Sequence, residues 1–360
     1  MRTSKIENEE ELDSVEISLI QYLGIFLVGV LTVGLVTPKI RKLAIKHSIY
    51  DSPNSIHKTH TMPVPYLGGV GIILSVVVIS IAGSWYFDSS QVLKIIGIVL
   101  PCLILGVVGL IDDLIILKPW PRFVVQTAVG ATVSGILTLT NTMGSPTGYL
   151  MLDILITITF IVCLSNSINF FDNIDGGASG TVAISSLVLS ILAFQSEQFY
   201  IAALASLIAG STLGFLWWNR SPARIYMGDA GSLFLGSIMA SLLVRFEPSP
   251  ISFSASFFVP LFLVAIPLLD TLVVIVSRLA QHKSPFQGGR DHLSHRLMRL
   301  GVGKVHAVLI LWFLTGMYGL MSIVLSNVSV KFEKFTVIFG AAVWLIICAF
   351  FIRVPSEDNN

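Results

Sequence analysis

The sequence predicts an all-α fold, a polytopic membrane bundle of about 11 transmembrane helices. Hydrophobic residues make up 54% of the 360 residues and charged residues only 12%, whereas soluble domains carry roughly 25% charge. The chain also contains many apolar runs close to the roughly 20 residues that a helix needs to cross a bilayer. These two observations exclude a globular domain surrounded by water.

Eleven apolar runs meet the length requirement: residues 17–37, 64–84, 92–111, 123–140, 150–168, 177–194, 199–217, 231–247, 255–277, 305–327 and 336–352. We therefore treat residues 17–353 as one transmembrane domain. Residues 1–16 are acidic and lack the basic start of a signal peptide, so they are expected to form an extracytoplasmic tail. Residues 354–360 are expected to form a short cytoplasmic tail.

The distribution of basic residues predicts the orientation of the bundle. Of the 22 Lys and Arg residues, 16 fall in the segments on one side of the predicted spans and 6 on the other. Cytoplasmic loops carry an excess of Lys and Arg. The sequence therefore places the N-terminus outside and the C-terminus in the cytoplasm.

Acidic residues gather on the predicted cytoplasmic side, beginning with Asp112 and Asp113 at the end of an apolar run. Adjacent carboxylates repel each other, so they must be solvated or bind a cation. Mg²⁺ is typically held by one or two carboxylates together with substrate phosphates and water. A solvated helix end, or a local ion pair with Lys118 or Arg122, is the alternative.

A second acidic segment contains Asn169, Asp172 and Asp175, spaced by three residues. On a helix these positions share one face. The glycines that follow, Gly176 and Gly177, free the backbone for close approach to a ligand. Helix capping would explain one of the acids but not the whole set.

Asp229 lies between two glycines at the start of an apolar run. An acid at this position favours a helix N-terminus, and free N–H groups at a helix start also bind phosphate. Arg220 and Arg224 precede it and are suited to bidentate phosphate contacts. The segment therefore indicates either a helix start or a phosphate site.

A basic segment near the end of the chain contains Arg290, His292, His295 and Arg296. Two His residues three apart could bind zinc, but no third soft ligand is near and two Arg residues would oppose a dication. A site for a pyrophosphate anion fits this composition better.

One further acid, Asp270, lies within a predicted span. Ionisable residues inside spans are rare and are usually functional. A structural ion pair with Arg278 or with a lysine of the first cytoplasmic loop is the alternative.

Taken in order, these segments resemble the polyprenyl-phosphate N-acetylhexosamine-1-phosphate transferases, from about residue 50 to residue 305. The resemblance rests on Asp112-Asp113, on Asn169-x-x-Asp172-x-x-Asp175-Gly176, on Met227-Gly228-Asp229, on His292 and His295, and on Lys58 before Pro63-x-Pro65-x-x-Gly68-Gly69. The combination is specific, whereas each motif alone is not.

The resemblance implies a catalytic domain whose active site faces the cytoplasm and depends on Mg²⁺, with Mn²⁺ as an alternative. It implies catalytic roles for Asp112, Asp113, Asp172, Asp175, His292 and His295, and metal ligation by Asp229 with Asp113 and Asp175. Together with the basic residues described above, the expected substrate contacts are Lys58, Asn169, Arg224, Arg290 and Arg296.

The reaction implied by the resemblance is transfer of N-acetylhexosamine-1-phosphate from a UDP-sugar to polyprenyl (undecaprenyl) phosphate, with release of UMP. This is the initiating step of a cell-envelope polysaccharide such as a lipopolysaccharide or a teichoic acid. The expected location is the inner (plasma) membrane, among membrane lipids. No nucleic-acid partner is expected, and a homodimer is one option for the assembly.

Two features favour a donor of the N-acetylglucosamine type. Leu293 and Ser294 separate the two histidines, whereas the peptidoglycan branch of the family has three consecutive His residues. Eleven spans with an inner C-terminus also resemble the N-acetylglucosamine branch. His57 stands where the first loop of the family often has Arg, which leaves the sugar open.

Three alternatives remain at this level. The first is the phospho-MurNAc-pentapeptide transferase of peptidoglycan synthesis. The second is an intramembrane prenyltransferase, but the apolar residues 114–117 do not continue an Asp-rich motif after Asp113. The third is a secondary transporter, which typically places its charged site at the midplane between inverted repeats; here the acids lie at helix ends and no repeat is evident.

Overall fold

The structure, a computed structural model, describes residues 3–51, 63–87, 92–115, 117–142, 147–248, 252–284 and 289–355. Its elements are α1 (Thr3–Lys46), β1 (Tyr50–Asp51), β2 (Val64–Pro65), α2 (Gly68–Phe87), α3 (Val92–Ile115), α4 (Pro119–Leu139), α5 (Leu150–Phe171), α6 (Gly177–Gln195), α7 (Phe199–Asn219), α8 (Gly228–Arg245), α9 (Phe253–Leu263), α10 (Ala265–Ala280), α11 (Leu293–Arg299), α12 (Lys304–Asn327) and α13 (Val330–Arg353). The two short strands pair antiparallel. The predicted all-α fold is confirmed.

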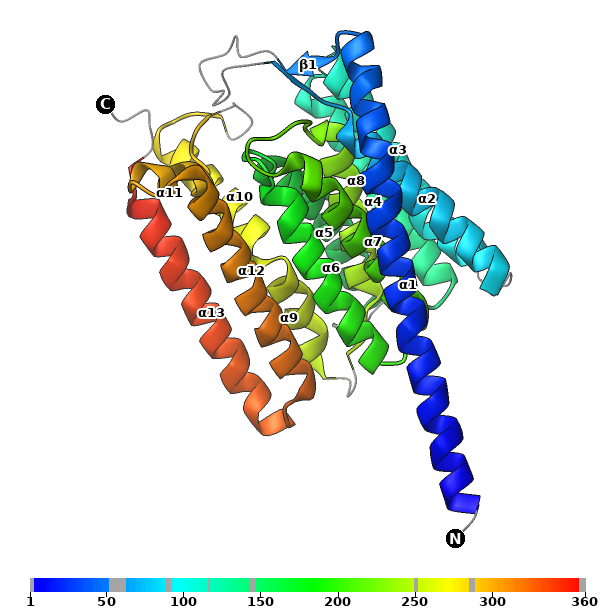
Figure 1. The fold of residues 1–360 in the computed structure, drawn as a ribbon. Coiled ribbons are helices and arrows are strands. Elements are labelled where there is room, and N and C mark those ends of the chain that lie inside the picture. Colours follow the sequence, from blue (N-terminus) through cyan, green and yellow to red (C-terminus); the bar gives the residue numbers. More distant parts are fainter. Residues whose placement is uncertain are drawn as a thin grey trace.

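The helices form one bundle with a buried centre and an apolar outer surface (Figure 1). In the apolar windows of α6 and α7, 67% of the residues are buried, against 11% for α1 and 17% for α13. Exposed side chains of the outer helices include Leu31, Leu35, Phe335 and Ile338. Such a surface suits hydrocarbon rather than water, because lipid tails are as apolar as these side chains.

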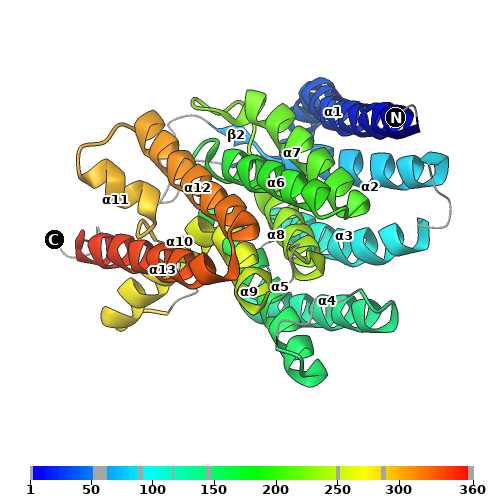
Figure 2. The same cartoon turned by 90° about the horizontal axis from the view of Figure 1, so that it is seen from below.

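Helix α8 occupies the centre of the bundle, between α3, α5 and α6 (Figure 2). Every residue from Ala230 to Leu243 is buried. Small residues make this possible: a Cβ on Gly236 would lie 2.6 Å from the Cα atom of Ser165 in α5. Small residues at helix interfaces let backbones approach closely.

Each of the eleven predicted spans corresponds to a helix or to a pair of helices. Among the described residues, nine helices are long and apolar enough to cross a membrane, and the pair α9 and α10 adds a tenth if it is one span. Helix α8 is 18 residues long and is not one of the nine. The predicted number of eleven spans therefore stays a prediction.

Helices α9 and α10 meet at an angle of 70°, at a break that proline explains. Pro267 is the third residue of α10 and has no N–H to donate to the carbonyl one turn earlier. That carbonyl, of Leu263, accepts a hydrogen bond from Ser185 Oγ at 2.6 Å instead. A backbone group inside a bilayer needs such an internal partner, so the serine stabilises the break.

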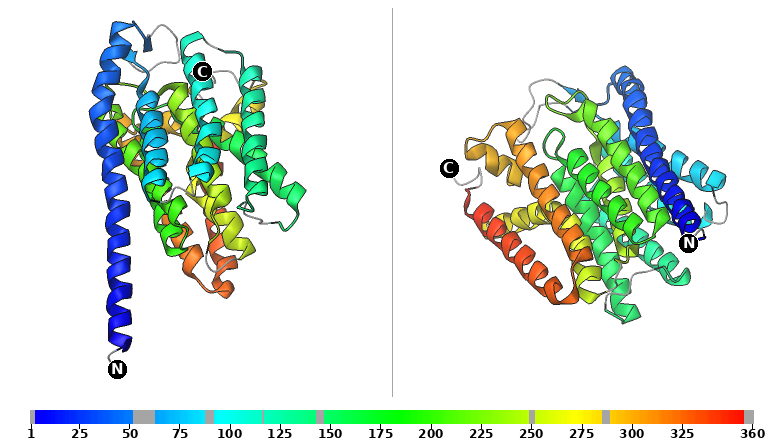
Figure 3. Two further views of the ribbon diagram at one scale, coloured as in Figure 1. Left: turned by 90° about the vertical axis from the view of Figure 1, so that its right-hand side faces the viewer. Right: turned by 60° about the horizontal axis from the view of Figure 1, so that its bottom comes forward.

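The start of α1 and the end of α13 lie at opposite ends of the bundle (Figure 1). Helix α1 begins within the acidic segment and extends past the other helices toward the N-terminus (Figure 3). The end of α13 lies beside α11, at the same end as β1 (Figure 1). Opposite ends agree with an odd number of crossings, and the assignment of the C-terminal end to the cytoplasm stays a prediction.

That assignment predicts the labelling of the segment after α10. Ser284→Cys, in a background that replaces the exposed Cys163, should react with an impermeant thiol reagent only after the cytoplasm is opened. Lys331→Cys, at the opposite end of the bundle, should react in intact cells and serves as the control. The reverse pattern would contradict the orientation.

Candidate active site

The segment before α2 docks on the segment before α8. Gly68 and Gly69 donate backbone hydrogen bonds to the carbonyls of Tyr226 and Met227, each at 2.9 Å. A Cβ on Gly69 would lie 2.3 Å from the Cα of Gly231, so only glycine allows this approach. Two motifs that are far apart in the sequence are therefore held together by backbone contacts.

The carboxylate of Asp113 caps the N-terminus of α8. Its two oxygens accept hydrogen bonds from the backbone N–H groups of Asp229 at 2.9 Å and Ala230 at 3.1 Å. Gly228 has φ of +73°, and a Cβ there would lie 2.5 Å from Asp113 Oδ2. The first N–H groups of a helix have no partner within the helix, so Asp113 satisfies two of them from α3.

Arg122 joins polar side chains of three segments. Its Nη1 atom forms ion pairs with Asp112 and, at 3.0 Å, with Asp229. Its Nη2 atom donates to Asn169 Oδ1 at 3.3 Å, and Asn169 Nδ2 donates to Asp229 Oδ1 at 2.8 Å. The alternative of an ion pair between the Asp-Asp step and Arg122 is thus confirmed for Asp112, which is buried.

Asp172 lies at the end of α5 without a partner of its own. No hydrogen bond or ion pair joins its carboxylate to the residues that the structure describes. Burial and three neighbouring carboxylates raise the pKa of Asp172 to about 7. Those neighbours are Asp229, Asp113 and Asp175.

The expectation that Asn169, Asp172 and Asp175 share one helix face was only partly right. Helix α5 ends at Phe171, so only Asn169 lies in the helix. Asp172 is the C-cap residue, and Asp175 follows in a turn that ends at Gly176 with φ of +77°. The acids approach one another because the chain leaves the helix there, not because of helical spacing.

Asp175 is paired with a residue that the sequence did not single out. Its Oδ2 atom accepts a hydrogen bond from the backbone N–H of Ala223 at 3.1 Å and pairs with Lys304 Nζ at 2.8 Å. Lys304 is the first residue of α12. A lysine there opposes the helix dipole, and that unfavourable position was the one local sign that it needs an acid partner.

His292 is oriented by Asp270 from the broken helix. The His292 Nδ1 atom lies 2.8 Å from Asp270 Oδ2, and the backbone N–H of Leu293 donates to Asp270 Oδ1 at 2.7 Å. Asp270 is fully buried. Arg278, one of the partners suggested for it in the sequence analysis, instead pairs with Asp291 at 3.1 Å, and Lys58 of the first cytoplasmic loop lies outside the described residues.

The His292 segment is also attached to the end of α5. Ser294 Oγ donates a hydrogen bond to Asn173 Oδ1, and the rings of Phe170 and His292 meet edge to face at 6.5 Å. These contacts bring the histidine segment to the same end of the bundle as the acids.

His295 is a buried neighbour of His292, with their ring centroids 5.9 Å apart. Its Nδ1 atom has no hydrogen-bond partner among the residues that the structure describes. Burial, followed by the charge of His292, lowers the pKa of His295 to about 4. His295 is therefore neutral at pH 7.

The basic residues predicted to contact substrate lie in different environments. Arg296 is buried and donates to the backbone carbonyls of Asp291 at 2.7 Å and Phe351 at 2.8 Å, so it anchors α11 to the end of α13. Arg224 is exposed, with its guanidinium 5.7 Å above the ring of Trp218. Arg290 is half-buried next to the histidine segment. Lys58 lies outside the described residues.

The acids fit a hard dication, although no three His, Cys, Asp or Glu side chains converge as a ready ligand set within the described ranges. The observation that favours a metal ion is the position of the Asp172 carboxylate, which lies near other acids without a compensating cation among the described residues. Carboxylate oxygens are the ligands that Mg²⁺ takes. Asp172 and Asp229 are the residues that fit it best.

The sequence of this region matches a known family. Residues 95–247 match the model of glycosyl transferase family 4. They contain the Asp112 step, the Asn169 segment and Asp229, which the structure brings together. Over this range the chain is similar to glycosyl transferase family 4. Asp270 on α10 and the histidine segment at α11 lie beyond the matched range.

Relatives align over more of the chain than the family model does. A probable undecaprenyl-phosphate N-acetylglucosaminyl 1-phosphate transferase of Bacillus subtilis is 29% identical over 339 residues, 92% of each chain. A decaprenyl-phosphate N-acetylglucosaminephosphotransferase of Mycobacterium leprae is 29% identical, over 74% of this chain and 75% of the relative. A phospho-N-acetylmuramoyl-pentapeptide-transferase of Streptococcus thermophilus is 30% identical, over 58% of this chain and 66% of the relative.

The unpaired carboxylate predicts a pH dependence of stability. In EDTA, a raised pKa means that Asp172 stabilises the fold fully below its unfolded pKa of about 3.9 and loses this contribution as the pH rises through about 7. The melting temperature of Asp172→Asn, relative to that of the wild type, should therefore rise as the pH increases from about 5 to about 8. Mg²⁺ should reduce this difference in melting temperature at the higher pH. A difference that does not change with pH would contradict the assignment.

Proposed function

We propose that this chain transfers N-acetylhexosamine-1-phosphate, and specifically GlcNAc-1-phosphate, from a UDP-sugar to polyprenyl phosphate of the undecaprenyl type, with release of UMP. The observation that carries the proposal is the cluster of Asp113, Asp172 and Asp229 at one end of a membrane bundle, with Arg122 and His292 nearby. A site of this kind can bind a lipid phosphate that arrives from the membrane and a nucleotide-sugar that arrives from the cytoplasm.

The relatives favour GlcNAc over a muramoyl-pentapeptide donor. The relative named for N-acetylglucosamine aligns with 92% of this chain, whereas the muramoyl-pentapeptide relative aligns with 58%. The pair of histidines separated by Leu293 and Ser294 agrees with this choice. The product starts a cell-envelope polysaccharide in the plasma membrane.

The reaction needs one substitution at phosphorus. An oxygen of the lipid phosphate forms a bond to the sugar-linked phosphorus of the UDP-sugar, and the bond from that phosphorus to the bridging oxygen breaks, which releases UMP. Phosphate monoesters are largely doubly ionised at pH 7, since their second pKa is about 6. The lipid phosphate is therefore a sufficient nucleophile, and positioning and charge neutralisation supply most of the catalysis.

Asp113 supports direct transfer rather than a covalent enzyme intermediate. Both of its carboxylate oxygens are engaged by the start of α8, and those of Asp112 by Arg122 and by the backbone N–H of Leu117 at 2.5 Å. A nucleophilic carboxylate would have to give up these bonds. We assign Asp113 a positioning role that fixes Asp229.

The basic residues neutralise phosphate charge. Arg122 and Lys304 already lie among the carboxylates, and Arg290 lies beside the histidine segment. Mg²⁺ held by Asp172 and Asp229, with Asp175 near, would neutralise charge on the donor pyrophosphate. His292, oriented by Asp270, would donate a hydrogen bond to a phosphate oxygen through its remaining nitrogen, Nε2.

The direct test measures UMP release by the purified protein from UDP-GlcNAc and polyprenyl phosphate with Mg²⁺, against a panel of other UDP-N-acetylhexosamines. Asp229→Asn should lower turnover at least roughly a hundredfold, because a metal ion contributes several kcal/mol of charge stabilisation. Its melting temperature should stay close to that of the wild type, which separates loss of chemistry from loss of fold. Turnover by Asp229→Asn with an unchanged Mg²⁺ requirement would contradict the role.

A second test concerns Asp270 and His292 as one unit. Each of Asp270→Asn and His292→Ala should lower kcat/KM by roughly tenfold to a hundredfold, about 1.5–3 kcal/mol for a lost charged hydrogen bond. Residues that act as a unit are not additive, so the double variant should be no slower than the slower single variant. Additive losses would show that the two side chains act separately.

A further inference from the structure

The end of the bundle opposite the acids carries a pair of cations on the same two helices. Lys94 lies near the start of α3, which ends beside Asp113, and Arg245 is the last residue of α8, which begins beside Asp229. At 1.5 Å per residue these cations lie roughly 24–28 Å from the acids along the helices. That separation is close to the roughly 30 Å hydrocarbon thickness of a bilayer.

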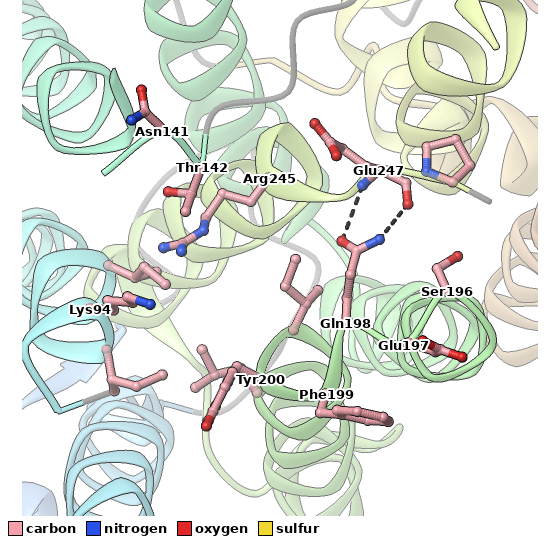
Figure 4. Close-up of a pocket in the computed structure, with 15 residues that line it drawn as sticks. Lys94, Asn141, Thr142, Ser196, Glu197, Gln198, Phe199, Tyr200, Arg245 and Glu247 are labelled. Carbon is pink, nitrogen blue, oxygen red and sulfur yellow. Dashed lines mark hydrogen bonds between the residues drawn. The ribbon is translucent and has the colours of Figure 1, made fainter. Parts of the chain in front are cut away.

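Lys94 and Arg245 line one cavity of about 570 Å³. Figure 4 shows their amine and guanidinium groups on the same side of the cavity, next to Thr142. Glu197 lies on the far side of the cavity from the two cations (Figure 4), and Glu247 also lines it. The cavity therefore contains both charges, with its two cations gathered on one side.

The shape of the cavity is fixed by a loop contact. The backbone N–H of Glu247 donates to Gln198 Oε1 at 3.1 Å, and Gln198 Nε2 donates to the carbonyl of Glu247. This pair of hydrogen bonds ties the end of α8 to the turn between α6 and α7 (Figure 4). The position of Arg245 thus follows from the fold.

Neither cation forms an ion pair or a hydrogen bond with the part of the chain that the structure describes. Lys94 is exposed and Arg245 is partly buried, and two like charges that line one cavity repel each other. An anion that sits between them would offset this repulsion. A phosphate group matches both the charge and the donors available.

An apolar groove of about 720 Å³ adjoins the cavity. It runs between α1, α2 and α7 and includes Ile25, Val28 and Val78. The groove and the cavity share four lining residues: Ile95, Phe199, Tyr200 and Leu204. A cationic cavity that continues into an apolar groove matches a molecule with an anionic head and a hydrocarbon tail.

We propose that this composite site binds an anionic phospholipid of the leaflet opposite the active site, with its phosphate at Lys94 and Arg245 and an acyl chain in the groove. The phosphate of the polyprenyl acceptor belongs at the acid cluster, at the other end of the bundle. A lipid whose head lies at Lys94 is therefore a different molecule. A zwitterionic lipid fits less well, because its ammonium group would face the same two cations.

The test measures lipid binding to the full-length protein in detergent, by native mass spectrometry and by thermal shift, with phosphatidylglycerol and with phosphatidylcholine of identical chains. Phosphatidylglycerol should bind more tightly and raise the melting temperature more. Lys94→Gln and Arg245→Gln should each weaken phosphatidylglycerol binding roughly tenfold, because each removes a charged hydrogen bond. Lys331→Gln, an exposed lysine at the same end, is the matched control and should change nothing.

The groove is tested separately. Gly83 lines it, and a Cβ on Gly83 meets no atom within 4 Å, so Gly83→Phe should fill the groove without disturbing the helix and should weaken phosphatidylglycerol binding. Gly135→Phe, at an equally open position on α4, is the control. Equal binding of the two lipids, or an equal effect of Lys331→Gln, would overturn the proposal. Stabilisation by inorganic phosphate alone, insensitive to Gly83→Phe, would overturn it in favour of a simple anion site.

Discussion

The hydrogen bonds from the start of α8 to the carboxylate of Asp113 are the constraint on which the site depends. They join the end of α3 to the start of the central helix, where unpaired N–H groups carry partial positive charge. The close approach requires glycine: a Cβ on Gly109 would lie 2.3 Å from the carbonyl oxygen of Asp229. With α8 fixed in this way, Asp229 contacts Arg122 and Asn169.

Two cations compensate part of the acidic charge around this contact. Asp112 and Asp229 share Arg122, and Asp175 has Lys304. Asp113 is held by backbone N–H groups instead. Asp172 has neither kind of partner among the described residues, and its raised pKa reflects both burial and the surrounding carboxylates. The fold therefore holds its acids close together with two cations placed among them, and leaves one carboxylate available for an added cation. Buried acids without such partners would protonate or drive the chain apart.

The broken pair α9 and α10 serves the other half of the site. The break at Pro267 turns α10 so that Asp270, one turn further on, lies under the histidine segment. Ser185 and the indole N–H of Trp344, which donates to the carbonyl of Ala265 at 3.0 Å, supply the hydrogen bonds that the break leaves open. An interrupted helix is tolerated in a bilayer when neighbouring helices satisfy its backbone in this way.

The sequence by itself determined the class of the fold and the residues of interest. Apolar runs of 20 residues have one stable solution in a bilayer, so the helices followed from length and composition. Acids at the ends of such runs are costly enough to indicate a site, which is why Asp113, Asp172 and Asp229 could be selected before their partners were known. Only the tertiary structure decided which groups the acids contact: Lys304 contacts Asp175, His292 contacts Asp270, and the start of α8 contacts Asp113. It also showed that Arg296 anchors a helix and that Asp172 lies beyond the end of α5. Such pairings depend on how distant helices pack, and side-chain spacing within one segment carries no information about the segment that faces it.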